Sequence, residues 1–250
     1  MKLCVVIPVY NHEHAIGHVV SAIRQLALPV VLVDDGSTPA CAAVLDELAL
    51  QAGVTLSRHE INQGKGAAVM TGMRLAAELG YTHALQIDSD GQHDIADLPP
   101  VIALAQQHPE AIIAGYPVYD ESVPRSRLYG RYATHIWVWI NTLSLRIKDS
   151  MCGLRVYPLA PTLALINRVH IGLRMDFDAE ILVRLDWRNV PIINVPVHVS
   201  YPIDGVSHFD LWRDNVLISV MHTRLFFGML PRLPALLWRL VTGRAAMRRA

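Results

Sequence analysis

The sequence contains little charge for its length. Charged residues make up 18% of its 250 positions, hydrophobic residues make up 52%, and the formal net charge is zero. A chain this apolar can bury a large core, so disorder is not expected. Because the net charge is zero, we expect no nucleic-acid partner. The length allows one large α/β domain, or one domain with an appendage.

Cysteines are also few, and none forms a C-x-x-C pair. Cys4, Cys41 and Cys152 are scattered along the chain. This pattern fits a reducing compartment and argues against a zinc site. The segment Met1–Pro8 has one basic residue and a short apolar run, which predicts a first strand rather than a signal peptide. No uninterrupted apolar run is long enough to span a bilayer. We therefore expect a cytoplasmic location.

Acidic residues are absent from Asn215 to the end of the chain, where six arginines occur. This part carries +6, and the preceding 214 residues carry −6. Apolar residues stand between the arginines, and a basic amphipathic pattern of this kind suits an anionic membrane surface. The alternative is a helix packed on the domain. We predict that residues 209–250 form a basic, amphipathic helical region that lies peripherally on the inner face of the membrane.

Two common phosphate-binding loops are missing. The segment Asn62-Gln63-Gly64-Lys65-Gly66 has His59 where a Walker A loop needs its first glycine, and Gly66 replaces the Ser or Thr after the lysine. Val69 occupies the third glycine position of a G-x-G-x-x-G motif. These departures argue against a P-loop NTPase and a dehydrogenase. The glycines and the lysine still suit an anionic ligand at a helix N-terminus.

Short apolar runs alternate with longer helical patterns in the first half of the chain. Strands are predicted at Leu3–Ile7, Val30–Val33, Val54–His59, His83–Ile87 and Ala111–Gly115. Helices are predicted between them at about His14–Leu26, Ala40–Gln51, Gly66–Leu79 and Leu98–Gln107. This order implies an α/β fold with a mainly parallel central sheet and helices on both faces. Strands that are apolar throughout fit a sheet covered on both sides.

The pattern changes after Gly115. Further elements are predicted as helices at Arg125–Ser144 and Asp178–Arg188, strands at Gly153–Pro158 and Ile192–Val199, and two helical segments from Phe209 that meet near a break at Gly228–Pro231. We predict one α/β domain over residues 1–208, followed by the helical region 209–250.

Acidic turns follow two of the predicted strands. One reads Asp88-Ser89-Asp90-Gly91-Gln92-His93, and two carboxylates one residue apart suit Mg²⁺ or Mn²⁺ carrying a diphosphate. The alternative is an ordinary turn, in which Asp and Gly are common. The other contains Asp34 and Asp35, which can accept hydrogen bonds from a base or a ribose, or can cap the helix near Ala40. In open parallel sheets, ligands bind at such strand ends.

Two charged clusters lie in the second half of the chain. Four arginines near Lys148–Ser150 can clamp phosphate oxygens, or can form a solvated face: Arg125, Arg127, Arg131 and Arg155. Asp176, Asp178 and Glu180 begin a helix, where acidic residues favour the dipole. One of these three carboxylates is also a candidate general base or orienter near an acceptor. His208, in a polar loop, is a candidate phosphate or metal contact.

Together these motifs resemble the family 2 glycosyltransferases of GT-A (Rossmann-like) fold, and most closely the dolichol- or polyprenyl-phosphate mannosyltransferase-like branch. The resemblance covers roughly Leu3 to His208 and rests on five ordered segments: Val6-Ile7-Pro8-Val9-Tyr10-Asn11, Val33-Asp34-Asp35-Gly36-Ser37, Asn62-Gln63-Gly64-Lys65-Gly66, Asp88-Ser89-Asp90-Gly91-Gln92-His93, and Asp149-Ser150-Met151-Cys152-Gly153-Leu154-Arg155.

The resemblance implies a nucleotide-diphospho-sugar donor, a Mg²⁺ or Mn²⁺ cofactor and inversion at the anomeric carbon. It places the nucleotide-sugar against Pro8, Tyr10, Asp34, Asp35, Lys65 and Asp88, and the metal against Asp88, Asp90 and Gln92. Arg131 and Arg155 would hold acceptor or donor phosphate. The negative charge that develops on the leaving diphosphate would be stabilised by the metal and the arginines.

The expected reaction is transfer of the sugar to a lipid-linked or other membrane-associated acceptor, with a polyprenyl phosphate among the candidates. A phosphate acceptor is already anionic and needs no base. A hydroxyl acceptor would need Asp176, Asp178 or Glu180 to take its proton. The alternatives are a sugar-phosphate nucleotidyltransferase, and a catalytically silent, membrane-bound module that binds nucleotide-sugars. Asp88, Asp90 and Gln92 are all present, so decay of the site is not evident.

Overall fold

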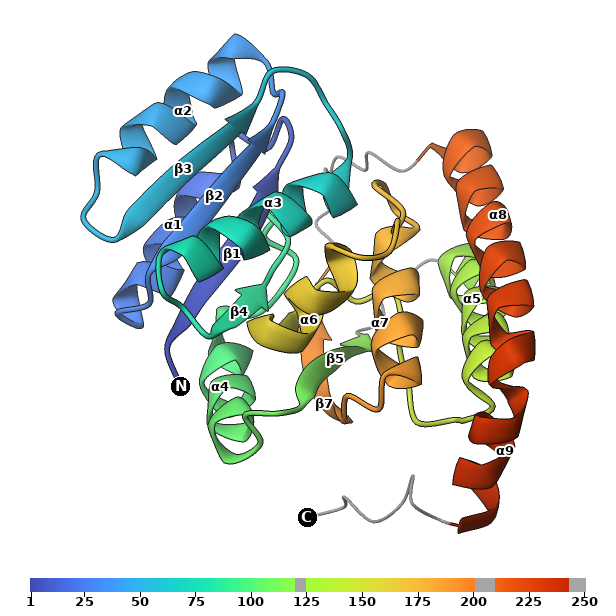
Figure 1. The fold of residues 1–250 in the computed structure, drawn as a ribbon. Coiled ribbons are helices and arrows are strands. Elements are labelled where there is room, and N and C mark those ends of the chain that lie inside the picture. The colour runs from blue at the N-terminus through green and yellow to red at the C-terminus, as the bar shows by residue number, and fades with distance from the viewer. Residues whose placement is uncertain (120–124, 201–209, 243–250) are drawn as a thin grey trace.

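A seven-stranded mixed sheet forms the centre of the molecule, with strand order β3-β2-β1-β4-β6-β5-β7 (Figure 1). The computed structural model describes residues 1–119, 125–200 and 210–242, and for residues 119 and 125–130 it describes the backbone only. The strands are β1 (Leu3–Val9), β2 (Val30–Asp35), β3 (Val54–His59), β4 (His83–Gln86), β5 (Ile112–Tyr119), β6 (Arg155–Pro158) and β7 (Ile192–Val199).

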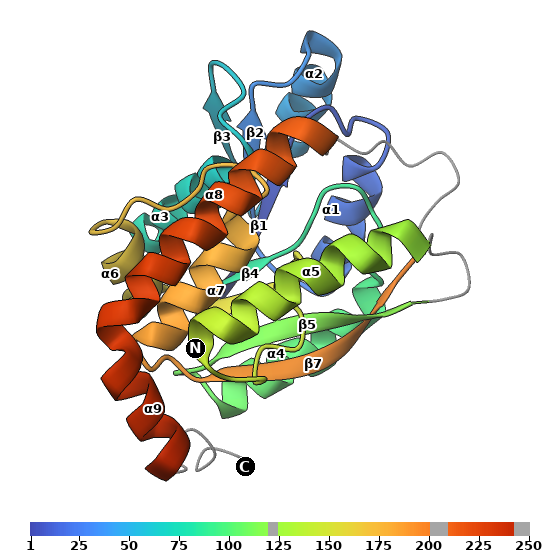
Figure 2. The same ribbon diagram turned by 90° about the vertical axis from the view of Figure 1, so that its right-hand side faces the viewer.

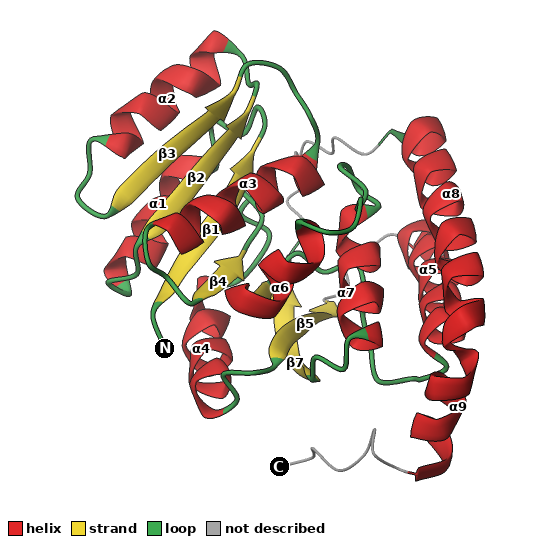
Figure 3. Ribbon diagram, viewed as in Figure 1, coloured by secondary structure: helices red, strands yellow, loops and turns green. Residues whose placement is uncertain are grey.

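Helices cover both faces of this sheet, as Figure 3 shows. They are α1 (Ile16–Gln25), α2 (Pro39–Ala49), α3 (Lys65–Glu78), α4 (Leu98–Gln107), α5 (Arg125–Thr142), α6 (Leu159–Ile166), α7 (Phe177–Trp187), α8 (Leu211–Met229) and α9 (Leu233–Thr242), with 3₁₀ turns η1 (Ile95–Asp97) and η2 (Leu230–Arg232). The predicted α/β fold, with helices on both faces and helical segments at the C-terminal end, is confirmed.

The sheet is mostly parallel, as predicted. β1 pairs in parallel with β2 and β4, β2 with β3, and β5 with β7. The exception is β6, which is antiparallel to both β4 and β5. The sequence analysis predicted a strand here but not its direction, because a four-residue strand carries no local signal of its partners. Helix α6, which follows β6 directly, was not predicted at all.

Each face of the sheet has its own hydrophobic core. Cys4 and Val6 of β1 contribute to the core beside α3, α6 and α7, whereas Val5 and Ile7 contribute to the core beside α1, α2 and α4. Successive side chains of a strand point to opposite faces. A strand buried on both sides must therefore be apolar at every position, which explains the continuous apolar runs in the sequence.

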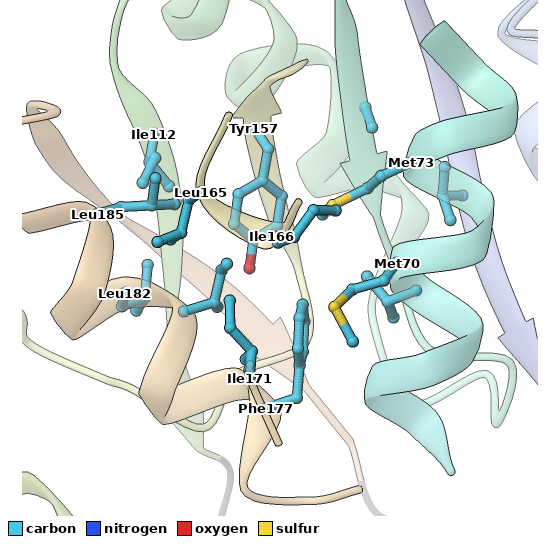
Figure 4. Close-up of a cluster of buried hydrophobic side chains, with 14 of the residues drawn as sticks. Met70, Met73, Ile112, Tyr157, Leu165, Ile166, Ile171, Phe177, Leu182 and Leu185 are labelled. Carbon is cyan, nitrogen blue, oxygen red and sulfur yellow. The ribbon is translucent and has the colours of Figure 1, made fainter. Parts of the chain in front are cut away.

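The first of these cores fixes the start of α7 against α3 (Figure 4). Phe177, the first residue of α7, is fully buried with Met70 and Met73 of α3 in the same cluster. At Gly66 an added Cβ would lie only 2.5 Å from the Cβ of Phe177, so the two helices approach as closely as a glycine allows. This packing holds the acidic first turn of α7 next to Lys65.

Helices α5, α8 and α9 form an outer layer beside α7 (Figure 2). Trp137 of α5 stacks on His222 of α8, with ring centroids 6.1 Å apart. The predicted break at Gly228–Pro231 is the single 3₁₀ turn η2, so helical structure continues over Leu211–Thr242. By length and composition alone, this stretch is long and apolar enough to cross a membrane, although it contains no uninterrupted apolar run of that length.

Arg224 and Arg239 of this layer turn toward the domain, whereas Arg213 of α8 is exposed. Arg224 forms an ion pair of 2.5 Å with Glu180, and Arg239 forms one of 2.9 Å with Asp186, both on α7. Arg232 stacks over the ring of Trp187, 4.7 Å from its centroid. The surface that results, here called the apolar face, consists of exposed side chains of α5, α8 and α9: Tyr132, Ile136, Trp137, Ile140, Leu211, Trp212, Val216, Val220, Phe227, Leu237, Trp238 and Leu240.

Candidate active site

The carboxyl ends of β1, β2 and β4 meet at one edge of the sheet. Parallel register places Val9 opposite Asp34, and Asp88 follows shortly after β4. This is the edge at which the sequence analysis expected a ligand. Pro8 is buried within β1, and Tyr10 is partly buried where the strand ends.

Asp34 and Asp35 are buried and hydrogen-bonded to other parts of the protein. Asp34 accepts hydrogen bonds from Ser37 N–H (2.9 Å) and Arg58 Nε (2.7 Å). Asp35 contacts His59 Nδ1 at 2.7 Å and also accepts hydrogen bonds from two backbone N–H groups, those of residues 63 and 64, at 2.9 and 2.8 Å. In this structure the pair therefore ties β2 to β3 and to the start of α3.

The loop after β1 is joined to the loop after β2. Asn11 has a positive φ of 54°, a conformation that asparagine tolerates better than most residues. Its N–H donates to Ser37 Oγ (3.1 Å), and its side-chain oxygen accepts from Thr38 N–H (2.8 Å). These bonds fix the two loops that border the proposed nucleoside position.

Lys65, the first residue of α3, joins two carboxylates that are distant in sequence. Its Nζ lies 2.7 Å from Asp88 Oδ1 and 2.9 Å from Asp178 Oδ2. Burial disfavours the charge of this ammonium, but Asp178 and Asp88 outweigh burial and hold the pKa of Lys65 above its ordinary value. Burial also disfavours the charge of Asp88, and Lys65 in turn keeps the pKa of Asp88 below its ordinary value.

Several backbone amides at the start of α3 already donate within the protein. The amides of Gln63 and Gly64 donate to Asp35, and that of Ala67 donates to Leu173 O at 3.0 Å. Gly64 has φ 108°, and an added Cβ would collide with Leu173 O. The charge that this segment offers an anion is therefore chiefly the Lys65 ammonium.

The predicted metal turn places Asp90, Gln92 and His93 around Asp88. Asp90 Oδ1 accepts a hydrogen bond from Gln92 N–H at 3.0 Å, which closes the turn. Burial and the neighbouring Asp88 raise the pKa of Asp90. His93 Nε2 lies 4.0 Å from Asp88 Oδ2, and burial lowers the pKa of His93, which favours the neutral imidazole.

The segment from Asp149 to Arg155 forms the wall opposite this turn. Arg131 donates to Asp149 through Nε (2.5 Å) and Nη2 (2.9 Å), and Asp149 accepts from the backbone N–H of Cys152 at 2.7 Å. Burial opposes the charge of Asp149, but hydrogen bonds from His135 and Arg131 hold its pKa far below the ordinary value. Gly153 then abuts Asp88, because an added Cβ at Gly153 would collide with the Asp88 carboxylate.

Arg155 is fully buried in β6, opposite Gln86 of β4. Its Nη1 donates to Tyr157 Oη (3.1 Å) and to the backbone oxygen of Asp178 (2.6 Å). Its Nε and Nη2 have no hydrogen-bond partner among the described residues. Arg155 thus supports the start of α7 from below the site.

The three acidic residues at the start of α7 have different surroundings. Asp178 accepts from Gln86 Nε2 (3.1 Å) and pairs with Lys65, so it joins the metal turn. Glu180 is fully buried and pairs with Arg184 and Arg224, so it joins α7 to α8 instead. Asp176 accepts from the N–H of residue 174, and burial raises its pKa.

The chemistry of the turn fits a hard divalent cation. Asp88 and Asp90 offer carboxylate oxygens, the ligands that Mg²⁺ and Mn²⁺ prefer. Among the described residues no group of three or more His, Cys, Asp or Glu side chains is arranged to hold a metal. A cation at Asp88 and Asp90 would therefore need further ligands, which a diphosphate can supply.

An open cavity of about 530 Å³ lies beside the metal turn. It is lined by Gly91, His93, Asp94, Ile95, Val118, His198, Val199 and Ser200. His93 connects the cavity with the turn, since its ring also faces Asp88. Sequence reasoning did not find this cavity, because its walls come from the β4 turn and the ends of β5 and β7.

Sequence reasoning also missed the partners of Asp34 and Asp35. Arg58 and His59 stand directly opposite Asp34 and Asp35 in the β2–β3 register. Aligning the ends of the two predicted strands would have given that signal. Other predictions fall outside what the structure describes: the side chains of Arg125 and Arg127, and residues His208, Arg244, Arg248 and Arg249.

Comparison with known proteins gives a consistent family. The family model described as Glycosyl transferase family 2 matches residues 4–171. A UDP-N-acetylglucosamine–dolichyl-phosphate N-acetylglucosaminyltransferase of Methanococcus voltae is 25% identical over 90% of this chain and 93% of its own length. An undecaprenyl-phosphate mannosyltransferase of Micrococcus luteus is 26% identical over 79% of this chain and 83% of its own.

Solved structures show the same fold. Glucosyl-3-phosphoglycerate synthase from Mycobacterium tuberculosis, crystallised with Mn²⁺, UDP-glucose and phosphoglyceric acid, aligns with a TM-score of 0.64 at 16% identity. The alignment covers 91% of this chain and 79% of that one. At this identity the likeness establishes the fold, and the chemistry must be argued from the residues described above.

Proposed function

Because the chain belongs to glycosyl transferase family 2, we propose that it transfers a sugar from a nucleotide-diphospho-sugar to a lipid-linked phosphate of the polyprenyl-phosphate type. Family membership makes it a nucleotide-sugar glycosyltransferase. The observation that carries the donor side is the half-buried cluster of Asp88, Asp90 and Lys65 at the end of β4. Carboxylates for a cation and an ammonium for phosphate oxygens stand there within one small volume.

On the donor side, Asp88 and Asp90, with Gln92, would hold Mg²⁺ or Mn²⁺. When bound, the cation neutralises charge on the departing diphosphate. Lys65 stands next to Asp88 as a half-buried positive charge that needs little reorganisation during the reaction. Pro8, Tyr10 and the loops fixed by Asp34 and Asp35 would form the edge against which the nucleoside rests.

On the acceptor side, the structure favours a nucleophile that is already charged. Asp178 pairs with Lys65, and Glu180 pairs with two arginines, so neither is an unpaired base. Asp176 is the remaining base candidate among the three. A phosphate monoester can attack the anomeric carbon without losing a proton. Arg131 and Arg155 are the cations we propose to hold its charge.

The apolar face supports a lipid-linked acceptor. It includes exposed Trp212 and Trp238 on α8 and α9, and Trp137 on α5, the helix that also carries Arg131. We propose that this face lies parallel to the membrane plane, at the boundary between the headgroups and the acyl chains of the inner leaflet. The ion pairs of Arg224 and Arg239 with α7 hold the helices along the domain, which argues for an in-plane rather than a spanning helix.

The donor and acceptor are tested with purified protein. A thermal-shift screen of UDP-, GDP- and CDP-sugars with Mn²⁺ identifies the donor, because a ligand at 100 times its Kd stabilises by about 2.7 kcal/mol. The selected donor is then incubated with undecaprenyl phosphate in vesicles, or with phosphoglyceric acid as a soluble phosphate control. We expect a glycolipid and a nucleoside diphosphate from the vesicles only.

Other products would overturn the proposal. Release of pyrophosphate from an NTP and a sugar phosphate would identify a nucleotidyltransferase instead. Transfer to the soluble phosphate but not to the lipid would contradict the acceptor class. Binding of nucleotide-sugars without turnover on either acceptor would support the silent binding module.

The membrane surface is tested by vesicle sedimentation. The double variant Trp212→Glu and Trp238→Glu should bind anionic vesicles at least tenfold more weakly, a loss of about 1.4 kcal/mol. Leu50→Glu and Ile61→Glu change exposed apolar residues just after α2 and just after β3, outside the apolar face, and serve as matched controls. Unchanged binding of the double variant would remove the membrane proposal. Resistance of the native protein to alkaline extraction would indicate a spanning helix.

A further inference from the structure

We propose that Lys65 is a displaceable occupant of the metal site, which keeps Asp88 from binding a divalent cation until the donor diphosphate arrives. The inference rests on the proposed function, since it concerns the same donor site. It assigns Lys65 a positioning role in the order of binding, in addition to any contact with phosphate.

The first observation is the double engagement of Lys65. Its single ammonium lies 2.7 Å from Asp88 and 2.9 Å from Asp178, at the contact distances of charge-assisted hydrogen bonds. Asp178 is anchored from its other side by Gln86 Nε2 at 3.1 Å. Lys65 therefore has a second partner that stays in place if Asp88 is taken by a cation.

The second observation is that Asp88 has little freedom to leave Lys65. Gly153 lies so close to the Asp88 carboxylate that not even a methyl group would fit between them. His93 stands 4.0 Å from the other carboxylate oxygen. A cation that binds Asp88 must therefore approach the same carboxylate that Lys65 occupies, and two positive charges at that distance repel each other in a partly buried site.

The third observation is that the protein alone offers few ligands. The described residues contain no preformed group of three or more metal-ligating side chains. Asp90 does not compensate for the loss of Asp88, because one of its carboxylate oxygens already accepts a hydrogen bond from Gln92 N–H at 3.0 Å. A diphosphate supplies oxygen ligands to the cation and gives the Lys65 ammonium a new anionic partner.

Cation and diphosphate should therefore bind together and increase each other's affinity by the same factor. The free protein should bind Mn²⁺ weakly. Once the diphosphate has drawn Lys65 away, Asp88 becomes a full ligand. The arrangement would prevent the enzyme from holding a cation in an empty site.

The test is a titration of the free protein with Mn²⁺ alone, followed by electron paramagnetic resonance, in the absence and presence of UDP or GDP. In the native protein, the nucleoside diphosphate should raise Mn²⁺ affinity at least tenfold. Lys65→Met should bind Mn²⁺ at least tenfold more tightly without nucleotide, and the nucleotide should then change its affinity less than threefold. Lys65→Arg, which keeps the charge, should resemble the native protein.

Two further variants keep the test decisive. Asp178→Asn leaves Lys65 with Asp88 as its one carboxylate partner and should weaken Mn²⁺ binding by the free protein, so the proposal can be tested even if Lys65→Met does not fold. Arg58→Met removes a cation from the same edge that pairs with Asp34 instead, and should leave Mn²⁺ affinity unchanged. An equal gain from Arg58→Met would reduce the effect to general electrostatics and overturn the proposal.

The failures of the two proposals look different. Tight Mn²⁺ binding by the free native protein, or coupling between Mn²⁺ and nucleotide that survives in Lys65→Met, would overturn the role of Lys65 and leave the proposed function standing. If neither the native protein nor Asp90→Ala bound Mn²⁺ or nucleotide, the role of Lys65 and the proposed function would both be overturned.

Discussion

The acidic turns after β2 and β4 look alike in the sequence but differ in their surroundings. Asp34 and Asp35 accept hydrogen bonds from an arginine and from three backbone amides, and Asp35 also contacts His59. Asp88 and Asp90 instead have one ammonium, one backbone amide and an imidazole 4.0 Å away. The first turn is satisfied by the protein itself, whereas the second still has capacity for a ligand.

The difference predicts that the turn after β2 serves stability and that the turn after β4 serves function. Carboxylates that are buried and fully hydrogen-bonded stabilise the fold, and removing one leaves its partners unsatisfied. Asp90, whose pKa is raised by burial and by Asp88, instead fits a carboxylate that is retained for a ligand. The predictions below ask whether the two turns separate in this way, beginning with the largest expected effect.

Replacing the ligand-facing carboxylate should abolish activity without loss of stability. Asp90→Ala should lower kcat/KM for sugar transfer at least 1000-fold, about 4 kcal/mol. The pKa of Asp90 is raised in the folded protein, so its charge at neutral pH opposes folding, and its removal should leave Tm unchanged or higher. Nucleoside diphosphate release and thermal unfolding measure the two effects. A large fall in Tm would contradict the comparison.

Replacing Asp35, whose hydrogen bonds the protein itself satisfies, should instead lower the stability of the fold. Asp35→Asn should lower the free energy of unfolding by about 3 kcal/mol, because it disrupts contacts with His59 and two backbone amides in a buried place. Urea unfolding measures the loss. Asp46→Asn is the control: this exposed partner of Arg58 should cost less than about 0.5 kcal/mol. A stable Asp35→Asn protein would remove the structural role.

A third carboxylate, Glu180, extends the comparison to α7. Glu180→Gln weakens the ion pairs with Arg184 and Arg224, so we expect a loss of about 2 kcal/mol and faster amide exchange in α8. Hydrogen-exchange mass spectrometry measures the second effect. If sugar transfer fell instead, with stability and exchange unchanged, Glu180 would be the catalytic base.

The smallest effect concerns pH and Asp149. Its pKa is depressed in the folded protein, so its stabilisation is present above the unfolded pKa, about 4, and is lost as pH falls toward the folded value. The native protein should therefore lose about 1 kcal/mol of its advantage over Asp149→Asn between pH 6 and pH 3. Urea unfolding across this range checks the sign. A difference that grows on acidification would be contrary to this expectation.

The first four strands and their ends could be predicted because the evidence for them is local. Continuous apolar runs such as Val30–Val33 mark strands buried on both faces, and acidic or glycine residues mark where each ends. Parallel pairing then brings the ends to one edge. The position of β6 between β4 and β5 could not be predicted, because pairing across the sheet depends on contacts with distant residues.

The partners within the site were beyond sequence reasoning for the same reason. Lys65 lies far from Asp178 in sequence, and only the packing of Phe177 against Gly66 brings them together. The arginines after Asn215 show the opposite case. Their composition predicted a basic surface; of those that the structure describes, Arg224 and Arg239 meet carboxylates of α7, Arg232 is exposed, and exposed apolar side chains lie on the same helices.

Because Gly153 lies so close to Asp88, a single added methyl group at Gly153 would disturb the site. Gly153→Ala would remove no charged or polar side chain, yet the new methyl would require the space that the Asp88 carboxylate occupies. Such a variant would be a conservative way to silence the enzyme in cells, without adding or deleting a charge. Enzyme inactivated in this way would still carry its apolar face, and could therefore report where the protein goes independently of what it makes.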